Sequence, residues 1–205
     1  MRLNPTATFD CLFLLERLQP RLVKVAAAEL HLFAYLACLL WIFREKPVSD
    51  WDYSFVGTDL GAPFSRDIDE TVKEMMERGY FYRDEKSGLR PTESADDALR
   101  DLSNLSSYQE RRECLEAACS SIAAFSVGIV GTALSCEPDL SRSKAFPSTR
   151  QLLESTARDQ LYTQFAALRG ALSGRSADLR LPAVVWLSAL YQSNKQRTDT
   201  DGRNS

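Results

Sequence analysis

Apolar residues recur at helical spacing over most of the chain, with breaks at proline and glycine. Residues 6–19 carry apolar side chains on one side and predict a short amphipathic helix. A longer helix is predicted from about Leu22 to Arg44, because its centre, VAAAELHLFAYLACLLWIF, is apolar almost all round. Such a helix is typical of the centre of a small domain, and Pro47 closes it.

Residues 53–105 contain the signals of a helix followed by a β-hairpin. The turn Gly61–Phe64 precedes an amphipathic helix, and Ser65 is its expected N-cap, accepting a hydrogen bond from the backbone amide of Ile68. Gly79 ends this helix. Two short strands, Tyr80–Arg83 and Leu89–Pro91, are expected to form a hairpin around the turn Lys86–Gly88. Thr92 then opens the next helix.

Aromatic residues alternate with polar ones just before this module. Trp51, Tyr53 and Phe55 occupy every second position and predict a short strand, which we expect to be the third strand of the hairpin sheet. A helix followed by such a sheet is the order of elements in a winged helix.

The rest of the chain is predicted to be helical, over about Thr92–Leu102, Tyr108–Leu134, Ser148–Leu172 and Leu181–Gln192. The polar segment Glu137–Pro147 predicts a linker. The expected fold is therefore mainly α: a winged helix with a small antiparallel β-wing plus additional N- and C-terminal helices. Residues 1–105 would form the N-terminal helices and the winged-helix module, 106–193 a C-terminal helical region, and 194–205 a disordered tail without apolar residues.

Charge is unevenly distributed along the chain. Residues 1–137 hold 15 Lys and Arg against 22 Asp and Glu, whereas residues 138–205 hold 10 against 6. This asymmetry suggests a dipolar subunit whose two ends meet different partners. A solvated protein with no special partner shows the same pattern, so both interpretations stay open.

Residues with catalytic or metal-binding chemistry are scarce. The chain has one histidine, His31, inside an apolar run, and five cysteines without a CxxC spacing, so we expect reduced, buried thiols and no metal or cofactor. No phosphate-binding loop or nucleophile motif is present. Acidic pairs such as Asp67 with Asp69 fall at helix starts, where the helix dipole explains them. We expect a protein that is not an enzyme.

One uncharged stretch, Ala117–Cys136, has the length of a membrane span. Its small residues recur at every fourth position from Ser120 to Cys136, which favours a buried helix that another helix approaches closely. Asp10 and Glu16 interrupt the N-terminal apolar stretch, so no signal peptide is expected. The expectation is a cytoplasmic protein, and a membrane-associated helical protein is the distant alternative.

The winged-helix module carries a family resemblance. The motif residues are Gly61, Pro63, Phe64, Ser65, Gly79, Tyr80, Leu89, Pro91 and Thr92. Over residues 30–105 the chain resembles small bacterial winged-helix proteins of the YwgA and Panacea-antitoxin type. It is similar also to the middle components of three-component systems built around an ABC- or SMC-like ATPase, including Lamassu-type antiphage defence. The resemblance implies an accessory subunit that docks on the ATPase and assists DNA or effector-nuclease engagement.

The charges of the module bear on its binding partner. The expected recognition helix, Ser65–Arg78, has a net charge of −2, and phosphates would repel its five carboxylates. We therefore interpret it as a protein-binding element. A solvated face that binds nothing, and a DNA-binding transcription regulator or antitoxin, are the alternatives. The candidate partner-binding residues are Arg66, Asp69, Glu70, Lys73 and Glu77.

Basic residues in the C-terminal part are candidate phosphate contacts. They are Arg142, Lys144, Arg150 and Arg158. They are interspersed with acidic residues, so an ordinary solvated surface is the competing interpretation. DNA is expected to be held only through the complex.

Overall fold

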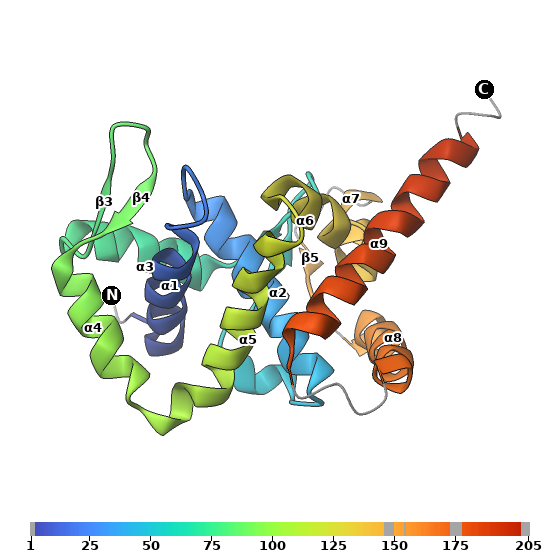
Figure 1. Cartoon of the computed structure of the whole chain (residues 1–205), viewed down its shortest axis with the longest axis horizontal. Helices are drawn as coiled ribbons and strands as arrows, with labels where there is room; N and C mark the ends of the chain where they lie inside the picture. The colour runs from blue at the N-terminus through green and yellow to red at the C-terminus, as the bar shows by residue number, and fades with distance from the viewer. Residues whose placement is uncertain (1–2, 146–149, 154, 173–177, 202–205) are drawn as a thin grey trace.

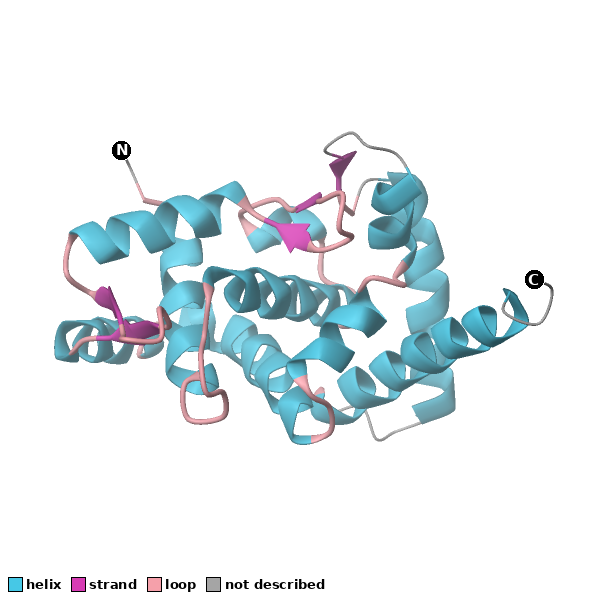
Figure 2. Ribbon diagram, turned by 90° about the horizontal axis from the view of Figure 1, so that it is seen from above, coloured by secondary structure: helices cyan, strands magenta, loops and turns pink. Residues whose placement is uncertain are grey.

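The computed structural model describes residues 3–145, 150–153, 155–172 and 178–201, and this part of the chain is mainly helical (Figure 1). The α-helices are α1 (Pro5–Leu18), α2 (Ala27–Phe43), α3 (Arg66–Glu77), α4 (Glu93–Ser103), α5 (Gln109–Ser120), α6 (Val127–Leu134), α7 (Pro138–Ala145), α8 (Ser155–Leu172) and α9 (Arg180–Asp201). The strands are β1 (Val56–Gly57), β2 (Pro63–Phe64), β3 (Phe81–Arg83), β4 (Leu89–Pro91) and β5 (Arg150–Gln151). They lie in two separate groups (Figure 2).

Helix α2 occupies the centre of the fold, as its uniformly apolar sequence predicts. It packs against α5, α1, α3 and α8. It begins at Ala27 rather than at Leu22, because the Glu29 carboxylate accepts the amide of Ala26 at 2.8 Å and caps the helix there. The preceding backbone is used elsewhere: the carbonyl of Val25 accepts the amide of Leu89 at 2.7 Å, which ties this loop to β4.

The expected helix and hairpin are present. Gly79 adopts a positive φ of 76° and ends α3, and the amide of Tyr80 bonds back to the carbonyl of Met75 at 2.9 Å. Strands β3 and β4 pair antiparallel, with Tyr82 opposite Arg90. Thr92 occupies the N-cap position of α4, and its hydroxyl makes no capping bond but donates to the carbonyl of Gly79 at 3.0 Å. The hairpin projects from one end of the molecule beside α3 and α4 (Figure 1).

The prediction of a third hairpin strand is wrong. The described hairpin sheet has two strands, and residues Val48–Trp51 form a 3₁₀ turn. Trp51, Tyr53 and Phe55 are buried and alternate with exposed residues, but they pack in the core around α2. The nearest strand, β1, instead pairs with β2 and β5 in the order β2-β1-β5.

The single helix predicted over Tyr108–Leu134 is also wrong. Helix α5 ends at Ser120, a 3₁₀ turn follows at Ser121–Ala123, and the chain bends by 117° before α6. The Ser121 hydroxyl donates to the carbonyl of Ala118 at 2.7 Å, and Ser126 caps α6. Such side-chain bonds compete with continuous helix. Within the described residues no single helix has the length and apolarity to cross a membrane, although α5 and α6 pass that test as a bent pair.

The predicted linker at Glu137–Pro147 is mostly helix α7, with residues 146–147 outside the described part. Glu137, Asp139 and Ser143 are buried, and α7 packs against β1 and α8. Its polar residues therefore form internal hydrogen bonds, whereas the sequence pattern indicated solvent exposure.

The C-terminal helices differ in length from their predictions. Helix α8 begins at Ser155, and residues 148–149 lie outside the described part. Helix α9 continues to Asp201, so the described beginning of the expected tail is helical, while residues 202–205 are not described. The division after residue 105 stays a prediction about domain organisation. Across it, α5 packs on α1 and α2, and apolar residues from both sides join one buried cluster.

Candidate partner-binding groove

Helix α3 presents an acidic face whose cations are already paired. Arg66 bonds to Glu70, Lys73 to Asp69 and Arg78 to Glu74, each at 2.6 Å and four residues apart on the same helix. The opposite face of α3 is buried against α1 and α2 through Ile68, Thr71, Val72 and Met75. Burial of that face fixes which side of the helix is offered to solvent.

A groove of about 240 Å³ runs between this acidic face and the start of the chain. It is lined by Leu3, Asn4, Asp67, Glu70, Thr71, Lys73, Glu74 and Glu77. The lining therefore has four carboxylates against one ammonium group. Glu77 is exposed to solvent, and no hydrogen bond or ion pair joins its side chain to another described residue.

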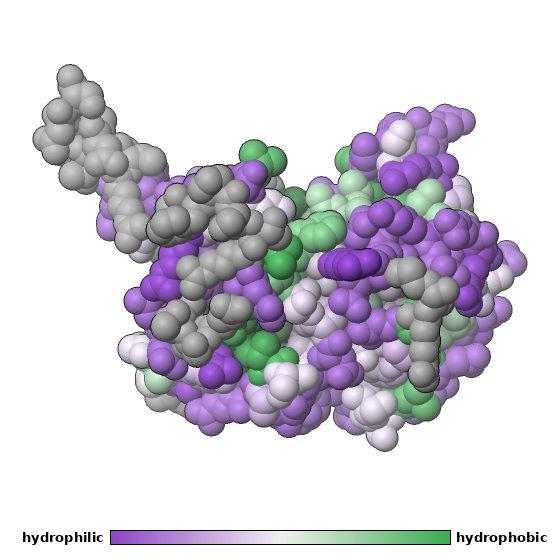
Figure 3. All heavy atoms as spheres, turned by 180° about the vertical axis from the view of Figure 1, so that it is seen from behind, coloured by the Kyte–Doolittle hydropathy of each residue, from purple (hydrophilic) through white to green (hydrophobic). Residues whose placement is uncertain are grey.

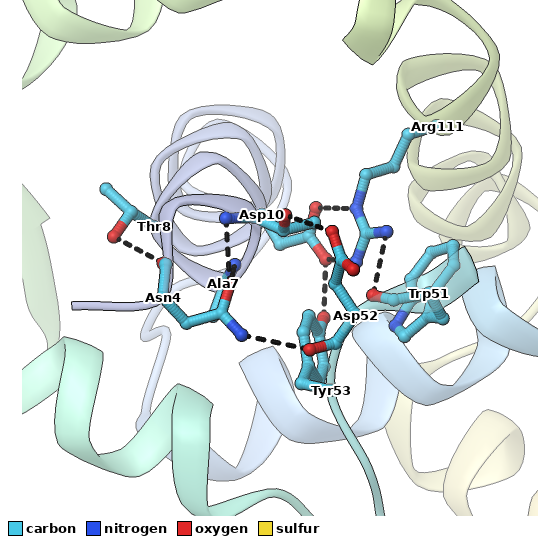
Figure 4. A network of polar contacts seen from close by, with 9 residues as sticks. Asn4, Ala7, Thr8, Asp10, Trp51, Asp52, Tyr53 and Arg111 are labelled. Carbon is cyan, nitrogen blue, oxygen red and sulfur yellow. Dashed lines mark hydrogen bonds and ion pairs between the residues drawn. The ribbon is translucent and has the colours of Figure 1, made fainter. Parts of the chain in front are cut away.

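Asn4 fixes the far wall of the groove. Its Oδ1 caps α1 by accepting the amides of Thr6 and Ala7, at 3.0 and 3.2 Å. Its Nδ2 donates to the carbonyl of Asp52 at 3.1 Å (Figure 4). The same Nδ2 donates to Asp67 Oδ1 at 3.2 Å. One amide thus joins the N-termini of α1 and α3.

Thr71 lies in the groove lining with an unused hydroxyl. The residue is 1% exposed, and its Oγ1 has no hydrogen-bond partner among the described residues. An unpaired buried polar atom costs free energy, so this hydroxyl has hydrogen-bonding capacity that the fold does not use.

The structure gathers three of the five predicted partner-binding residues in the groove: Glu70, Lys73 and Glu77. Arg66 and Asp69 do not line it, but they pair with Glu70 and Lys73. The sequence reasoning missed Asn4, Thr71, Asp67 and Glu74. The spacing of Asp67, Glu70, Glu74 and Glu77, at helical intervals, was a signal for those on α3.

The expected cap at the start of α3 is not formed. Ser65 occupies the N-cap position, but its side chain accepts no hydrogen bond there, and its Oγ is buried without a described partner. Its backbone amide instead donates to Nδ1 of His31 at 3.1 Å. Burial lowers the pKa of His31 to about 4, with the nearby Asp69 acting in the opposite direction. His31 is therefore a neutral core residue that anchors α3.

The candidate phosphate contacts are engaged at different places. Arg142 donates to Gln160 at 2.8 Å, and the Lys144 side chain lies against Gly61. Arg158 lines a separate cleft of about 410 Å³ with Phe55 and Leu153 among others. Arg150 belongs to β5, and its side chain is outside the described part.

Another cleft, of about 750 Å³, lies where α1 and α5 meet the start of α9. Its charged lining consists of Arg17, Arg44, Arg112, Arg180, Glu113, Glu116 and Asp178. Most of these charges pair with one another, as Arg17 does with Glu116 at 3.0 Å. The cleft therefore offers no single-sign field to a charged ligand.

A buried ion pair holds α1, α5 and the loop before β1 together (Figure 4). Arg111 donates to Asp10 Oδ1 at 2.6 Å, to Asp10 Oδ2 at 2.7 Å and to the carbonyl of Trp51 at 3.0 Å. The Tyr53 hydroxyl also donates to Asp10. Burial and the Asp10 charge raise the pKa of Tyr53 well above its usual value. Asp10 inside an apolar stretch was the sequence signal for this pair.

A second buried cluster surrounds Glu137. Its Oε2 accepts the Tyr35 hydroxyl at 3.1 Å and the amides of Asp139 and Leu140 at 3.1 and 3.0 Å. Burial raises the pKa of Glu137 to about 7. Asp139 in turn accepts the amide of Leu153 at 2.7 Å, so the cluster connects α2, α7 and the chain after β5.

Metal-ligating and nucleophilic residues are dispersed. In the described residues no group of three or more His, Cys, Asp or Glu side chains is arranged to hold a metal ion. Burial raises the pKa of the Cys114 thiol to about 12 and of Cys11, Cys38 and Cys119 above their usual values, which keeps these thiols protonated.

No family model, no curated protein and no solved structure matches this chain.

Proposed function

We propose that this protein is a non-catalytic accessory subunit of a bacterial antiviral or anti-plasmid defence complex. In this proposal it docks on an SMC- or ABC-type ATPase and assists engagement of DNA or of an effector nuclease. The segment from α3 through the β3–β4 hairpin to α4 acts as a winged helix that contacts protein. The resemblance carried by Gly61, Pro63, Gly79 and Thr92 supports the identity of the system.

The observation that carries the docking role is the internal pairing of every cation on α3. Arg66, Lys73 and Arg78 each satisfy a carboxylate of the same helix, and a net charge of −2 is left over Ser65–Arg78. Duplex binding depends on cations that neutralise phosphates. A phosphate would have to displace these pairs and then lie beside the remaining carboxylates.

The hairpin and α4 extend the same argument. Arg90 pairs with Asp84 at 2.8 Å, and Arg83 donates to the carbonyl of Ser87 at 3.2 Å. Arg100 pairs with Asp97 at 2.8 Å. The arginines of these elements are therefore engaged within their own turn or helix, and the surface favours a basic protein partner over a nucleic-acid backbone.

Exposed apolar area is a poor basis for docking in this protein. The large exposed apolar side chains of the described residues are Val23, Leu60, Tyr82, Leu105, Leu181 and Val185, which are scattered along the sequence. The face in Figure 3 is largely hydrophilic, with a narrow hydrophobic band through its middle. Charge and hydrogen bonding are thus the main means of recognition available to α3.

The test is to sequence the genes that flank this one and to co-purify the full chain with the ATPase and the nuclease that we expect them to encode. We expect a complex that survives size-exclusion chromatography. A monomer that ignores both neighbours would remove the proposal.

A DNA-binding regulator or antitoxin is the competing function, and one observation favours it. The side chains of Arg66 and Lys73 are 83% and 68% exposed, so phosphates can reach them. A salt-dependent gel shift with duplex DNA, abolished by Arg66→Glu with Lys73→Glu, would establish this alternative. We expect no shift at low salt from the isolated chain.

A further inference from the structure

We propose that the cleft of about 410 Å³ between residues 48–55 and residues 151–153 binds a small organic monocarboxylate, whose carboxylate pairs with Arg158 of α8. This inference does not depend on the docking role of α3, because the cleft and the groove beside α3 share no described lining residue. It is carried by the unmatched charge of Arg158, by the polar side chains that line the cleft with it, and by the bonds that hold the cleft walls.

Arg158 is the one partly buried cation that lacks a partner in the described part of the chain. Six other arginine and lysine residues there are buried or partly buried, and each has a carboxylate or another acceptor: Arg44, Lys46, Arg90, Arg111, Arg142 and Arg169. Withdrawing an ionised side chain from water is costly unless an acceptor compensates it. Arg158 has no acceptor among the described residues, so an anion from outside the fold would supply one.

Two uncharged polar side chains line the cleft together with Arg158. Ser54 and Gln151 are exposed, and neither side chain has a hydrogen-bond partner among the described residues. A hydroxyl and an amide can both donate to a carboxylate oxygen, as a guanidinium group does. The cleft therefore gathers one cation and two neutral donors whose hydrogen-bonding capacity the fold does not use.

Asp52 limits the charge of the ligand. It is the one carboxylate in the described lining, and its Oδ2 already accepts the Thr6 hydroxyl at 2.9 Å. Asp52 and Arg158 together give the described lining a formal charge of zero. A single negative charge can pair with Arg158, whereas a phosphate dianion or a nucleic-acid backbone would add repulsion from Asp52. The lining therefore favours a monocarboxylate.

The size and the apolar lining of the cleft indicate a short acid. The cleft volume lies within the range of about 300–1,000 Å³ that is usual for small-molecule sites. Val48 is half-buried, and Phe55, Leu152 and Leu153 are buried, so the apolar surface that a ligand can reach is narrow. A short aliphatic or aromatic acid suits such a surface.

Bonds within the fold hold the cleft walls in place. The amide of Leu152 donates to the carbonyl of Phe55 at 2.8 Å, which joins the two sides of the cleft. The amide of Leu153 donates to the buried Asp139 at 2.7 Å. Leu153 and Asp52 have φ values of 64° and 69°, which residues other than glycine keep only when the surrounding structure imposes them. Ordered walls reduce the entropy that ligand binding costs.

The test uses the ¹⁵N-labelled full chain and a matched pair of probes, phenylacetate and phenylacetamide, at constant pH and ionic strength. The probes have nearly the same shape and differ in charge. We expect phenylacetate to shift the amide signals of Ser54, Gln151 and Leu153 and the Nε–H signal of Arg158 in a saturable way. Phenylacetamide should bind at least about fivefold more weakly. Equal effects of the two probes, no saturation, or shifts spread over other basic residues would overturn the inference.

Inorganic phosphate and duplex DNA distinguish a carboxylate site from a phosphate contact. Each is added to the protein saturated with phenylacetate, at the same ionic strength. We expect the shifted signals to stay in place, because Asp52 opposes further negative charge in the cleft. Displacement of phenylacetate by phosphate or by DNA would assign Arg158 to phosphate binding and overturn the monocarboxylate inference.

Two arginine variants separate the cleft from general basicity. Arg158→Met removes a charge without a described partner, so its urea midpoint should be no lower than that of the wild type. Its affinity for phenylacetate should fall roughly tenfold, on the scale of one lost charged hydrogen bond. Arg112→Met, at an exposed arginine of α5 without a described ion pair, is the matched control and should bind as the wild type does.

Either property of Arg158→Met can contradict the proposal. Wild-type affinity for phenylacetate in this variant would show that the carboxylate binds elsewhere. A clearly lower urea midpoint would show that the fold itself compensates the charge of Arg158, which removes the reason for an external anion.

Discussion

Arg111 on α5 grips both carboxylate oxygens of Asp10 on α1, with N–O distances of 2.6 and 2.7 Å, inside the protein core. The guanidinium also lies 3.6 Å from the centre of the Trp51 ring. Because both charges are buried, removal of either partner would leave the other charge buried without compensation. The contact joins residues 101 positions apart and connects the first helix to the middle of the chain.

The ion pair predicts that mutations of its two residues have non-additive effects on stability. Asp10→Leu or Arg111→Met alone should lower the free energy of unfolding by about 3–5 kcal/mol, because each leaves an uncompensated buried charge. The double variant should cost clearly less than the sum. Urea unfolding measures all three. Arg100→Met, at an exposed pair, is the control and should change stability by less than about 1 kcal/mol. Additive single effects would contradict the coupling.

Glu137 predicts a stability loss as pH rises. Its pKa of about 7 in the folded protein lies above the ordinary value of 4.5, so its favourable contribution to stability is complete below pH 4.5 and disappears as pH rises through 7. Glu137→Gln removes this dependence. Between pH 5 and pH 8, the stability of the variant relative to wild type should therefore increase, by up to about 3 kcal/mol. Chemical denaturation at both pH values tests this, with Glu85→Gln as control. A difference that does not vary with pH would count against it.

His31 predicts the opposite pH dependence, a loss of stability as pH falls. Its pKa of about 4 in the folded protein lies below the ordinary value of 6.5, so the neutral ring contributes stability above pH 6.5 that is lost as pH falls towards 4. The chain has one histidine, so its ring signals are unambiguous in NMR spectra. We expect the ring to stay neutral at pH 5.5. A titration midpoint near 6.5 would show that the ring is solvated in solution.

Gly79 predicts a backbone effect without a packing effect. Its φ is 76°, and a Cβ placed there meets no atom within 4 Å. Gly79→Ala should therefore destabilise the protein by about 1 kcal/mol through the left-handed conformation alone. Gly131→Ala within α6 is the matched comparison: its Cβ makes only ordinary contact with Leu32, and we expect stabilisation of about 0.5–1 kcal/mol. Thermal unfolding of both variants separates the two cases.

Local signals made the helix and hairpin predictable. Gly79 acts through its own backbone conformation, so its role could be inferred without knowing the fold. The helix-start position of Thr92 was also predictable, although its hydroxyl bonds to Gly79, 13 positions away, rather than to the helix. The break between α5 and α6 depends on Ser121 and Ser126, whose hydroxyls turn to nearby backbone groups. Serine is compatible with a continuous helix and with a helix break, and the uncharged run Ala117–Cys136 gave no reason to expect the bend.

Long-range contacts account for the other differences. Glu137 and Asp139 are typical of a solvated linker until Tyr35 and Leu153 supply their hydrogen bonds. The groove shows the same limit: helical spacing reveals the carboxylates of α3, but Asn4 bonds to Asp67 only because α1 begins beside the start of α3, 63 positions away in sequence. Residue types alone do not show that these distant segments lie close together.

The pairing of β5 with β1 has a consequence for the order in which the protein matures on the ribosome. Val56 lies opposite Gln151 of β5, which is synthesised 95 positions later. Until then, one edge of β1 is bare, and the nascent N-terminal segment carries an open site for pairing with other chains. We expect a fragment truncated before β5 to aggregate during synthesis, even though its helix and hairpin are encoded locally.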